Sequence, residues 1–153
     1  MTTKVLGFWG PYRFLSNFVP VQVELDGITF KSVEHAYVAA KTTDPKTRRF
    51  IAHTETPGEV KRYGRKINLR PDWDTVKFQV MRGLLIQKFT TAPYEQLLLN
   101  TGNAYLEETN TWGDVIWGVC KGVGENNLGK LLMQIRTALQ TEARLLATGE
   151  EIT

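Results

Sequence analysis

A carboxylate and an amine stand seven residues apart in the segment 33–41. If this segment is helical, Glu34 and Lys41 fall on one face, roughly 10 Å apart along the axis. Lys41 leans back toward Glu34, because helical side chains lean toward the N-terminus. The distance is too long for the usual i,i+4 ion pair, so the two groups could instead both contact a ligand bound between them. On spacing alone, a dipole-favoured acid in the first turn and a solvent-facing lysine are the simpler interpretation.

Five aromatic residues surround three polar ones in the segment 8–18. A ligand site could use the aromatic rings to stack a base, and Arg13, Ser16 and Asn17 to hold a ribose or phosphate. A buried loop could use the same rings as core and the polar residues as turn formers. The residue types leave both interpretations open.

Two tryptophans have carboxylates as near neighbours: Trp73 lies between two aspartates, and Trp117 follows Asp114 by three residues. This combination suits binding of a heteroaromatic ring, but it also suits ordinary helix starts. The glycine-rich run that begins at Gly118 matches neither a Walker loop nor a dinucleotide fingerprint, so it is a weak phosphate signal. The basic cluster at 61–66 is either a phosphate site or a solvated helix end.

The elements that must position these residues can be read from turn and cap signals. Alternating apolar residues on both sides of Asp26-Gly27 predict a β-hairpin, and Ser32 predicts the N-cap of a helix over the segment 33–42. Further helix starts are predicted at Asp44, Thr56, Asp72 or Asp74, Pro93 and Asn127. Residues 103–126 are expected to form loops with short strands. The sum is a mainly helical α+β fold with a small antiparallel sheet near the N-terminus.

Composition limits the class of protein. The chain has 153 residues, 42% hydrophobic and 23% charged, which predicts one globular domain over 1–147 and a flexible tail over 148–153. We expect a cytoplasmic protein, since no segment resembles a membrane span or signal peptide and the single cysteine, Cys120, excludes an internal disulfide. The net charge of +3 suits an anionic ligand. His35, His53 and Cys120 show no metal-ligand spacing, so we predict a metal-independent protein.

Taken in order, these motifs resemble the YbiA-like family, also called NADAR. The matching blocks are residues 12–18, 33–37 with Lys41, 64–65, 70–74, 81 with 88–89, 98–102, 114–118 and 127–129. Each block is unspecific by itself, but their joint order covers nearly the whole chain. One departure is the segment 38–40, where the family tends to have bulkier residues and where small ones would widen the pocket or alter its selectivity.

The resemblance implies an N-glycosidase that breaks a bond from ribose C1 to nitrogen. Two substrate classes are associated with the family: phosphoribosylamino pyrimidines of riboflavin synthesis, and ADP-ribosylated guanine in DNA, RNA or free nucleotide. A non-catalytic module that binds ADP-ribose or a related nucleotide is the alternative. No cofactor or membrane partner is implied, and we expect a monomer or weak oligomer.

The resemblance also assigns roles. Glu34 would move protons and orient ribose hydroxyls, and Lys41 would act electrostatically or attack the ring-opened sugar to form a Schiff base. Asp114 would be a second acid/base or a ribose ligand. The expected substrate-binding residues are Arg13, Ser16, Asn17, Phe18, His35, Arg65, Trp73, Trp117 and Gly118, with the arginines meeting phosphate and a tryptophan stacking on the base.

Overall fold

The computed structural model describes residues 2–149 and divides into two compact units. The central unit is Asn17–Thr90, and the terminal unit combines the chain up to Ser16 with the chain from Thr91 onward. Helices dominate both, and the strands are two or three residues long. The predicted mainly helical α+β fold is confirmed.

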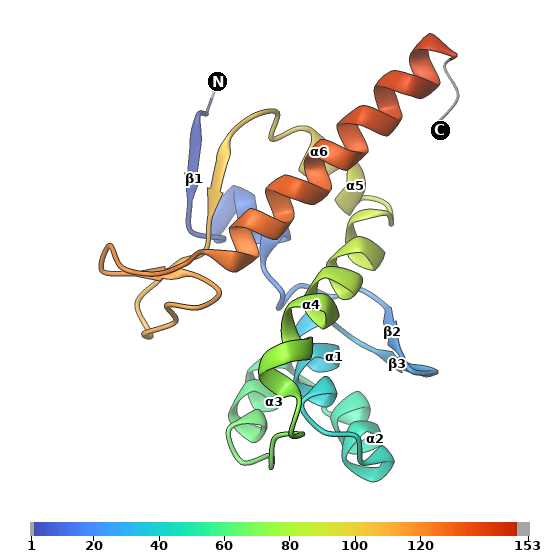
Figure 1. Cartoon of the computed structure of the whole chain (residues 1–153), viewed down its shortest axis with the longest axis vertical. Helices are drawn as coiled ribbons and strands as arrows, with labels where there is room; N and C mark the ends of the chain where they lie inside the picture. Colours follow the sequence, from blue (N-terminus) through green and yellow to red (C-terminus); the bar gives the residue numbers. More distant parts are fainter. Residues whose placement is uncertain (1, 150–153) are drawn as a thin grey trace. The chain divides into compact units, whose positions relative to one another are not determined.

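The central unit surrounds one short helix. It contains β2 (Val23–Leu25), β3 (Ile28–Phe30), α1 (Val33–Ala40), α2 (Pro45–His53), α3 (Pro57–Gly64) and α4 (Trp73–Phe89). Helix α1 packs against α2, α3, α4 and the β2–β3 hairpin, and nearly all of its residues are buried (Figure 1). The polar groups at its two ends are therefore held by a well-packed scaffold.

The predicted caps explain why these helices begin where they do. The Ser32 hydroxyl accepts a hydrogen bond from His35 N at 3.1 Å, and Asp44 accepts one from Thr47 N at 3.1 Å. At α3, Thr56 Oγ1 accepts from Glu59 N and donates to the Glu59 carboxylate. Each cap satisfies an amide that has no partner inside the helix. Asp72 occupies the N-cap position of α4 without a side-chain cap, since its carboxylate bonds Arg70 instead.

The hairpin forms in the predicted register, with Val23 opposite Phe30 and Leu25 opposite Ile28. Asp26 and Gly27 both have positive φ, 49° and 84°, as a type I′ turn requires. The outer edge of β2 is covered by the amide of Gln87, which accepts from Glu24 N and donates to Glu24 O, both at 2.8 Å. This side chain thus replaces a third strand.

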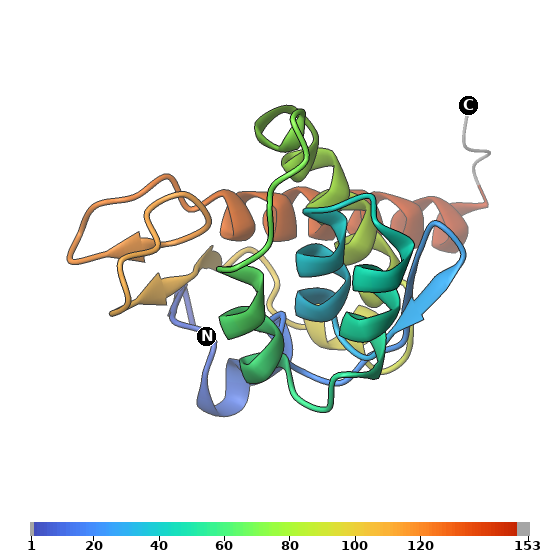
Figure 2. The same cartoon turned by 90° about the horizontal axis from the view of Figure 1, so that it is seen from below.

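The terminal unit is built on a long C-terminal helix. It contains β1 (Lys4–Leu6), the 3-10 helix η1 (Gly10–Leu15), α5 (Tyr94–Leu99), β4 (Tyr105–Glu107), β5 (Thr109–Asn110), β6 (Val119–Cys120) and α6 (Asn127–Thr148). Strand β1 pairs in parallel with β4, and β4 lies against α6 (Figures 1 and 2). The residue types did not predict β1, η1 or the parallel pairs. The predicted tail over 148–153 lies outside the described residues except for Thr148, which ends α6, and Gly149, which caps it.

Candidate functional site

Helix α1 places Glu34 in its first turn, as the sequence predicted, but it ends at Ala40, so Lys41 is its C-cap and not a residue inside the predicted helix over 33–42. Glu34 N donates to Asn17 O at 3.1 Å, which ties the start of α1 to the preceding loop. At the other end, Lys41 O accepts from Arg70 N at 2.7 Å. Both ends of α1 are therefore fixed by main-chain bonds, and the two side chains extend from a rigid element.

The Lys41 amine is partly buried rather than solvent-facing. Its Nζ lies 5.9 Å from the centre of the Tyr37 ring and 3.7 Å from the place a Cβ on Gly64 would occupy. Burial lowers the pKa of Lys41; the Glu34 carboxylate opposes this effect, and the Lys61 ammonium adds to it. A lowered pKa raises the fraction of neutral amine, which is the nucleophilic form.

Tyr37 and Trp73 form an aromatic wall beside Lys41. Their ring centres are 5.1 Å apart at 54°, a favourable tilted arrangement. Trp73 is only 6% exposed, so it packs mainly against the fold and supports Tyr37. Little of its ring surface is open for the predicted stacking on a base.

His35 is committed to the fold. Its Nδ1 lies 2.6 Å from Ser32 Oγ, and its Nε2 lies 3.0 Å from Thr54 O. A carbonyl only accepts, so Nε2 carries the proton and Nδ1 accepts from the serine hydroxyl. Burial lowers the pKa of His35, which agrees with this neutral form. The structure thus places His35 as a link between α1 and the α2–α3 loop.

Asn17 and Phe18 lie in the loop tied to the start of α1. The Asn17 amide nitrogen donates to Met81 Sδ at 3.6 Å, and its Oδ1 is buried without a hydrogen-bond partner among the described residues. Buried acceptors are normally satisfied, so Oδ1 is a candidate acceptor for a ligand donor. The Phe18 ring faces the Lys61 ammonium, 5.8 Å from the ring centre.

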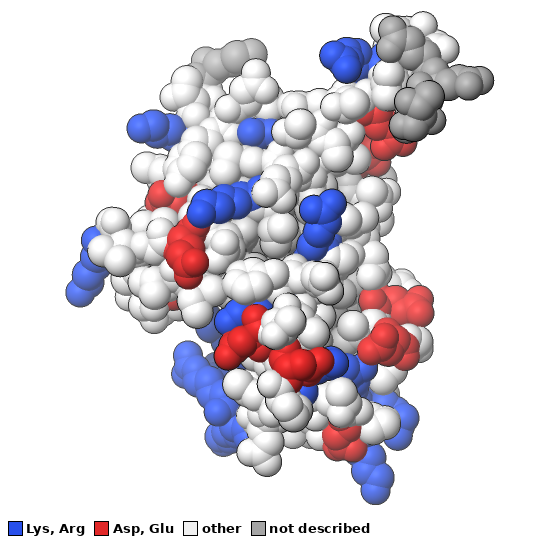
Figure 3. All heavy atoms as spheres, in the orientation of Figure 1, with Lys and Arg blue, Asp and Glu red and all other residues white. Residues whose placement is uncertain are grey.

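Positive charge gathers on α2 and α3. Residues 45–66 contain seven Lys or Arg and two Glu, a net charge of +5 in a chain whose total is +3. Figure 3 shows basic side chains over α3, at the lower left, and over α2, at the lower right. Arg65, the predicted phosphate ligand, lines a hollow of about 470 Å³ with Glu59, Arg62, Tyr63 and Lys66. Beside it, the exposed Phe50 ring packs on Tyr63 with ring centres 4.9 Å apart.

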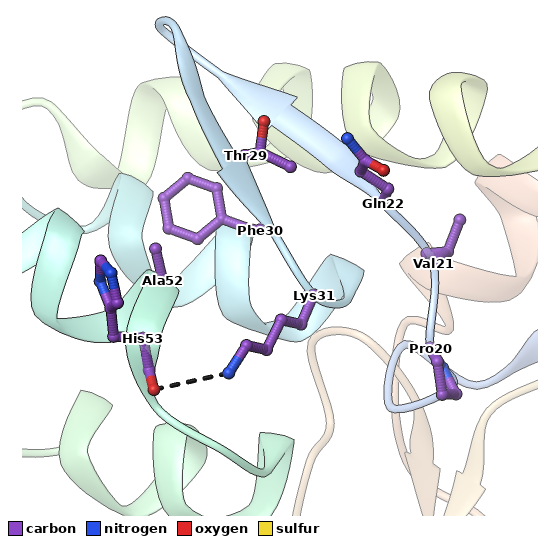
Figure 4. Close-up of a pocket in the computed structure, with 8 residues that line it drawn as sticks. All are labelled: Pro20, Val21, Gln22, Thr29, Phe30, Lys31, Ala52 and His53. Atoms are coloured by element: carbon purple, nitrogen blue, oxygen red, sulfur yellow. Dashed lines mark hydrogen bonds between the residues drawn. The ribbon is translucent and has the colours of Figure 1, made fainter.

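A larger hollow, of about 750 Å³, lies between the hairpin and the end of α2 (Figure 4). Lys31 crosses it and donates to His53 O at 3.5 Å and Thr54 O at 3.3 Å. The ammonium thereby satisfies carbonyls at the C-terminus of α2, where a cation is favoured by the helix dipole. None of the predicted site residues lines this hollow, and the interactions of its lysine are structural.

The remaining predicted residues belong to the terminal unit. Asp114 Oδ1 accepts from Ile116 N at 3.2 Å and Trp117 N at 2.9 Å, so this carboxylate organises its own loop. A Cβ on Gly118 would lie 2.1 Å from Glu108 O, so only glycine fits there. Arg13 is exposed near the end of η1, and its carbonyl accepts from Ser16 N at 2.9 Å.

Tyr37, Lys61 and Gly64 are neighbours of Lys41 that the sequence prediction of the site omitted. Tyr37 falls within the motif that names Glu34 and Lys41, so its position was a usable signal. Lys61 and Gly64 belong to a different helix, and only the packing of α3 on α1 brings them to the amine. Within residues 2–149, no group of three His, Cys, Asp or Glu is placed to hold a metal, and no helix is long and apolar enough to span a bilayer.

A family model described as the NADAR domain matches residues 5–140. The chain belongs to the NADAR family. It is 40% identical to N-glycosidase YbiA of Escherichia coli over 93% of this chain and 92% of that protein. It is 37% identical to an N-glycosidase of Nostoc punctiforme, covering 92% and 94%.

Two further relatives extend the comparison. The NMR structure of E. coli YbiA superimposes with a TM-score of 0.81 at 37% identity, over 94% of this chain and 89% of that one. A protein of Vibrio vulnificus named riboflavin biosynthesis protein is 34% identical over 86% of this chain, which spans 37% of that longer protein. The NADAR family therefore includes enzymes named N-glycosidase that share this fold.

Proposed function

We propose that this protein is an N-glycosidase that hydrolyses the bond between ribose C1 and nitrogen, with Lys41 and Glu34 as its central residues. The observation that carries the proposal is the partly buried Lys41 amine at one end of α1, with its pKa lowered, and the Glu34 carboxylate at the other. The names of the NADAR relatives support the reaction class.

The reaction begins at a carbon of the aldehyde oxidation level. Glu34, as a carboxylate, passes a proton from water to the ring oxygen as the ring opens, which leaves a C1=N iminium. The neutral Lys41 amine adds to C1, a proton passes from Lys41 to the leaving nitrogen, and that nitrogen departs as a neutral amine. Water then hydrolyses the lysine iminium, which releases the sugar aldehyde, returns one proton to solvent through Glu34 and regenerates Lys41. Each step keeps its atoms and charges balanced without a metal or cofactor.

The first substrate class is a phosphoribosylamino pyrimidine, supported by the relatives named for riboflavin biosynthesis. Arg65 and Arg13 would bind phosphate, and Asn17 Oδ1 would accept from a ligand N–H or hydroxyl. Asp114 and Trp117 would add a second acid/base or ribose contact and a stacking surface. Of the other predicted binding residues, Ser16 and Phe18 stay candidates for substrate contact, whereas His35, Trp73 and Gly118 would act by supporting the site. A cytoplasmic location and a monomeric or weakly oligomeric state stay predictions.

A second candidate class is ADP-ribosylated guanine on DNA or RNA. It is favoured by the net charge of +5 over residues 45–66 together with the exposed Phe50 ring, which packs on the half-buried Tyr63. Cations beside exposed aromatic rings suit a single-stranded nucleic acid. The α2–α3 surface, defined as Arg49, Phe50, Arg62, Tyr63, Arg65 and Lys66, would then contact the strand outside the adduct.

The test is incubation of the purified protein with both substrates, followed by mass spectrometry of the products. We expect base release from at least one substrate, unchanged by EDTA, and lost in Lys41→Ala and strongly reduced in Glu34→Gln. Lys130→Gln, an exposed lysine of α6, is the control and should retain activity. Absence of release from both substrates would contradict the glycosidase, and binding without release would favour the nucleotide-binding module.

Borohydride tests the covalent step. Reduction during turnover should attach the sugar to Lys41 as a stable secondary amine, located by peptide mass spectrometry. The adduct should be absent from Lys41→Ala and present in Lys130→Gln. Full activity of wild-type protein without a trapped adduct would remove the Schiff base and leave an acid/base mechanism.

A further inference from the structure

The face of α3 that meets α1 carries a second lysine. A Cβ on Gly64 would lie 2.9 Å from Val38 Cγ1 and 3.7 Å from Lys41 Nζ, which identifies this face. Lys61 stands three residues earlier, and residues i and i+3 are neighbours on one side of a helix. Because Gly64 has no side chain, the Lys41 amine approaches α3 closely, one turn away from Lys61.

Lys61 is held in place by Phe18, with its ammonium 5.8 Å from the ring centre. A cation over an aromatic face is attracted by the ring quadrupole. Lys61 is partly buried, unlike the exposed Arg62 and Arg65 that follow it. The Lys61 ammonium is near enough to Lys41 to act on it electrostatically, whereas neither Arg62 nor Arg65 is among the groups that shift the pKa of Lys41.

Two charged side chains act on the Lys41 amine with opposite effects. The Glu34 carboxylate, from the start of the same helix, favours the ammonium form and raises the pKa. Lys61, from α3, repels the ammonium and lowers the pKa, in the same direction as burial. Tyr37 adds a ring face without a formal charge. A neighbouring cation is a known means of activating a lysine nucleophile.

We propose that Lys61, held over Phe18, is a positioning residue that favours the uncharged, nucleophilic form of Lys41 by presenting a second positive charge across the α1–α3 contact. This inference rests on the proposed role of Lys41 as nucleophile. Lys61 itself touches neither the reacting carbon nor the leaving group in this scheme. Its contribution is electrostatic, so an arginine in its place should preserve it.

The direct test measures the reactivity of Lys41 without substrate. Reductive methylation with formaldehyde and cyanoborohydride labels neutral amines, and peptide mass spectrometry gives the rate at Lys41 as a function of pH. In Lys61→Gln we expect the midpoint for Lys41 to move to higher pH and its labelling rate at pH 7 to fall about three- to tenfold. Lys61→Arg should keep the wild-type midpoint, and Lys130→Gln, with the same loss of charge far along the chain, should not change it.

Enzyme kinetics provide the second readout. In Lys61→Gln, the acidic limb of the profile of kcat/KM against pH should move to higher pH, while KM changes little. In Lys61→Arg, the limb should lie at its wild-type pH. Phe18→Leu keeps the charge of Lys61 but removes the ring that holds it, so it should give a smaller shift in the same direction. This variant provides the test if Lys61→Gln does not fold. The proposal would be overturned by a labelling midpoint in Lys61→Gln equal to that of wild type. It would also be overturned if Lys61→Arg shifted the midpoint as much as Lys61→Gln does. Because labelling needs no substrate, a failed borohydride trap would reject the covalent step while this measurement still decided the role of Lys61.

Discussion

Lys41 is held where its charged form is disfavoured, and in the proposed mechanism this makes the reaction sensitive to pH. Its pKa is lowered chiefly by burial. Only the neutral amine attacks C1, so kcat/KM should rise as pH increases through that lowered pKa and reach a plateau at a pH where an ordinary lysine is still charged. The measurement is kcat/KM from pH 5 to 10.

Arginine at the same position separates nucleophilic from electrostatic action. Lys41→Arg keeps a positive charge but has no neutral form in this range, so activity should fall by about a thousandfold or more if Lys41 is the nucleophile. A variant that retained a tenth of the activity would instead support a purely electrostatic role.

His35 makes stability depend on pH in a predictable direction. Its folded pKa lies below the ordinary value of 6.5, because burial disfavours the charged ring. The unfolded chain therefore binds more protons between the folded pKa and 6.5, so this contribution to stability is complete above 6.5 and is lost as pH falls through the folded pKa. His35→Leu should remove this dependence and, by leaving Ser32 Oγ and Thr54 O without their ring partners, cost about 2–4 kcal/mol.

The measurement is urea unfolding of wild-type and variant proteins at a series of pH values. His53 is the matched control, since it is the other histidine of the chain and is exposed. His53→Gln should keep the wild-type dependence on pH. Equal slopes in wild type and His35→Leu would show that another group is responsible.

Residue types and the family resemblance predicted candidate residues for the site, but not the burial of the Lys41 amine. Spacing placed Glu34 and Lys41 on one helix, yet it favoured a solvent-facing amine. Lys88 shows the same limit: it continues an apolar stripe on α4, and the structure buries it completely, which lowers its pKa to about 7. A lysine at an apolar position was the available signal, but only packing decides whether the chain extends to solvent or stays buried.

At the scale of elements, the α1–α3 contact depends on a missing side chain. A methyl group on Gly64 would press on Val38, a short branched residue that is itself buried. Gly64→Ala should therefore lower the free energy of unfolding by about 1–3 kcal/mol, despite the better helix propensity of alanine. It should also slow the reaction, because α3 and the Lys41 amine are displaced together.

A compensating change tests whether this contact is the cause. Val38→Ala removes the two atoms that the new methyl would meet, at its own cost in core packing, so adding Gly64→Ala to Val38→Ala should lower stability much less than adding it to the wild type. Chemical denaturation of the four proteins of this cycle gives the coupling energy. Additive effects of the two substitutions would mean that the loss arises elsewhere. The three small residues at 38–40 are all buried within the packing of α1, and their effect on the width or selectivity of the pocket stays a prediction.

Elements with local causes were predictable, and those with distant causes were not. Ser32, Asp44 and Thr56 cap their helices through bonds to residues three positions ahead, so the signal lies in adjacent sequence. Strand β1 exists because Lys4 to Leu6 pair with residues about a hundred positions later. Its three residues carry too little pattern to predict a partner, and η1 likewise has no periodicity that separates it from a loop.

For the molecule as a whole, charge is distributed unevenly along the chain. Residues 45–66 hold a net charge of +5, so the remainder is slightly negative. One member of this set is internal: Arg48 is buried and pairs with Asp26 at 2.7 Å. The four cations of the α2–α3 surface, by contrast, are exposed beside the Phe50–Tyr63 pair. The sequence showed the local cluster at 61–66, but the folding of α2 beside it was needed to add an aromatic neighbour.

The α2–α3 surface should make the dependence of kcat/KM on salt concentration differ between the two substrate classes. For ADP-ribosylguanine on a single strand, kcat/KM should fall with increasing salt, since each phosphate contact contributes a slope of about 0.7. For the phosphoribosylamino pyrimidine the fall should be shallower, because the small ligand meets the site and not the α2–α3 surface.

Reversing two charges, Arg62→Glu with Lys66→Glu, should raise KM for the oligonucleotide about tenfold or more, reduce its salt slope, and leave KM for the small substrate nearly unchanged. The matched control is Lys121→Glu with Lys130→Glu, two exposed lysines of the terminal unit that change the net charge by the same amount. If the control raises KM for the oligonucleotide equally, long-range charge and not this surface is responsible; if neither pair affects it, the α2–α3 surface does not contact the strand.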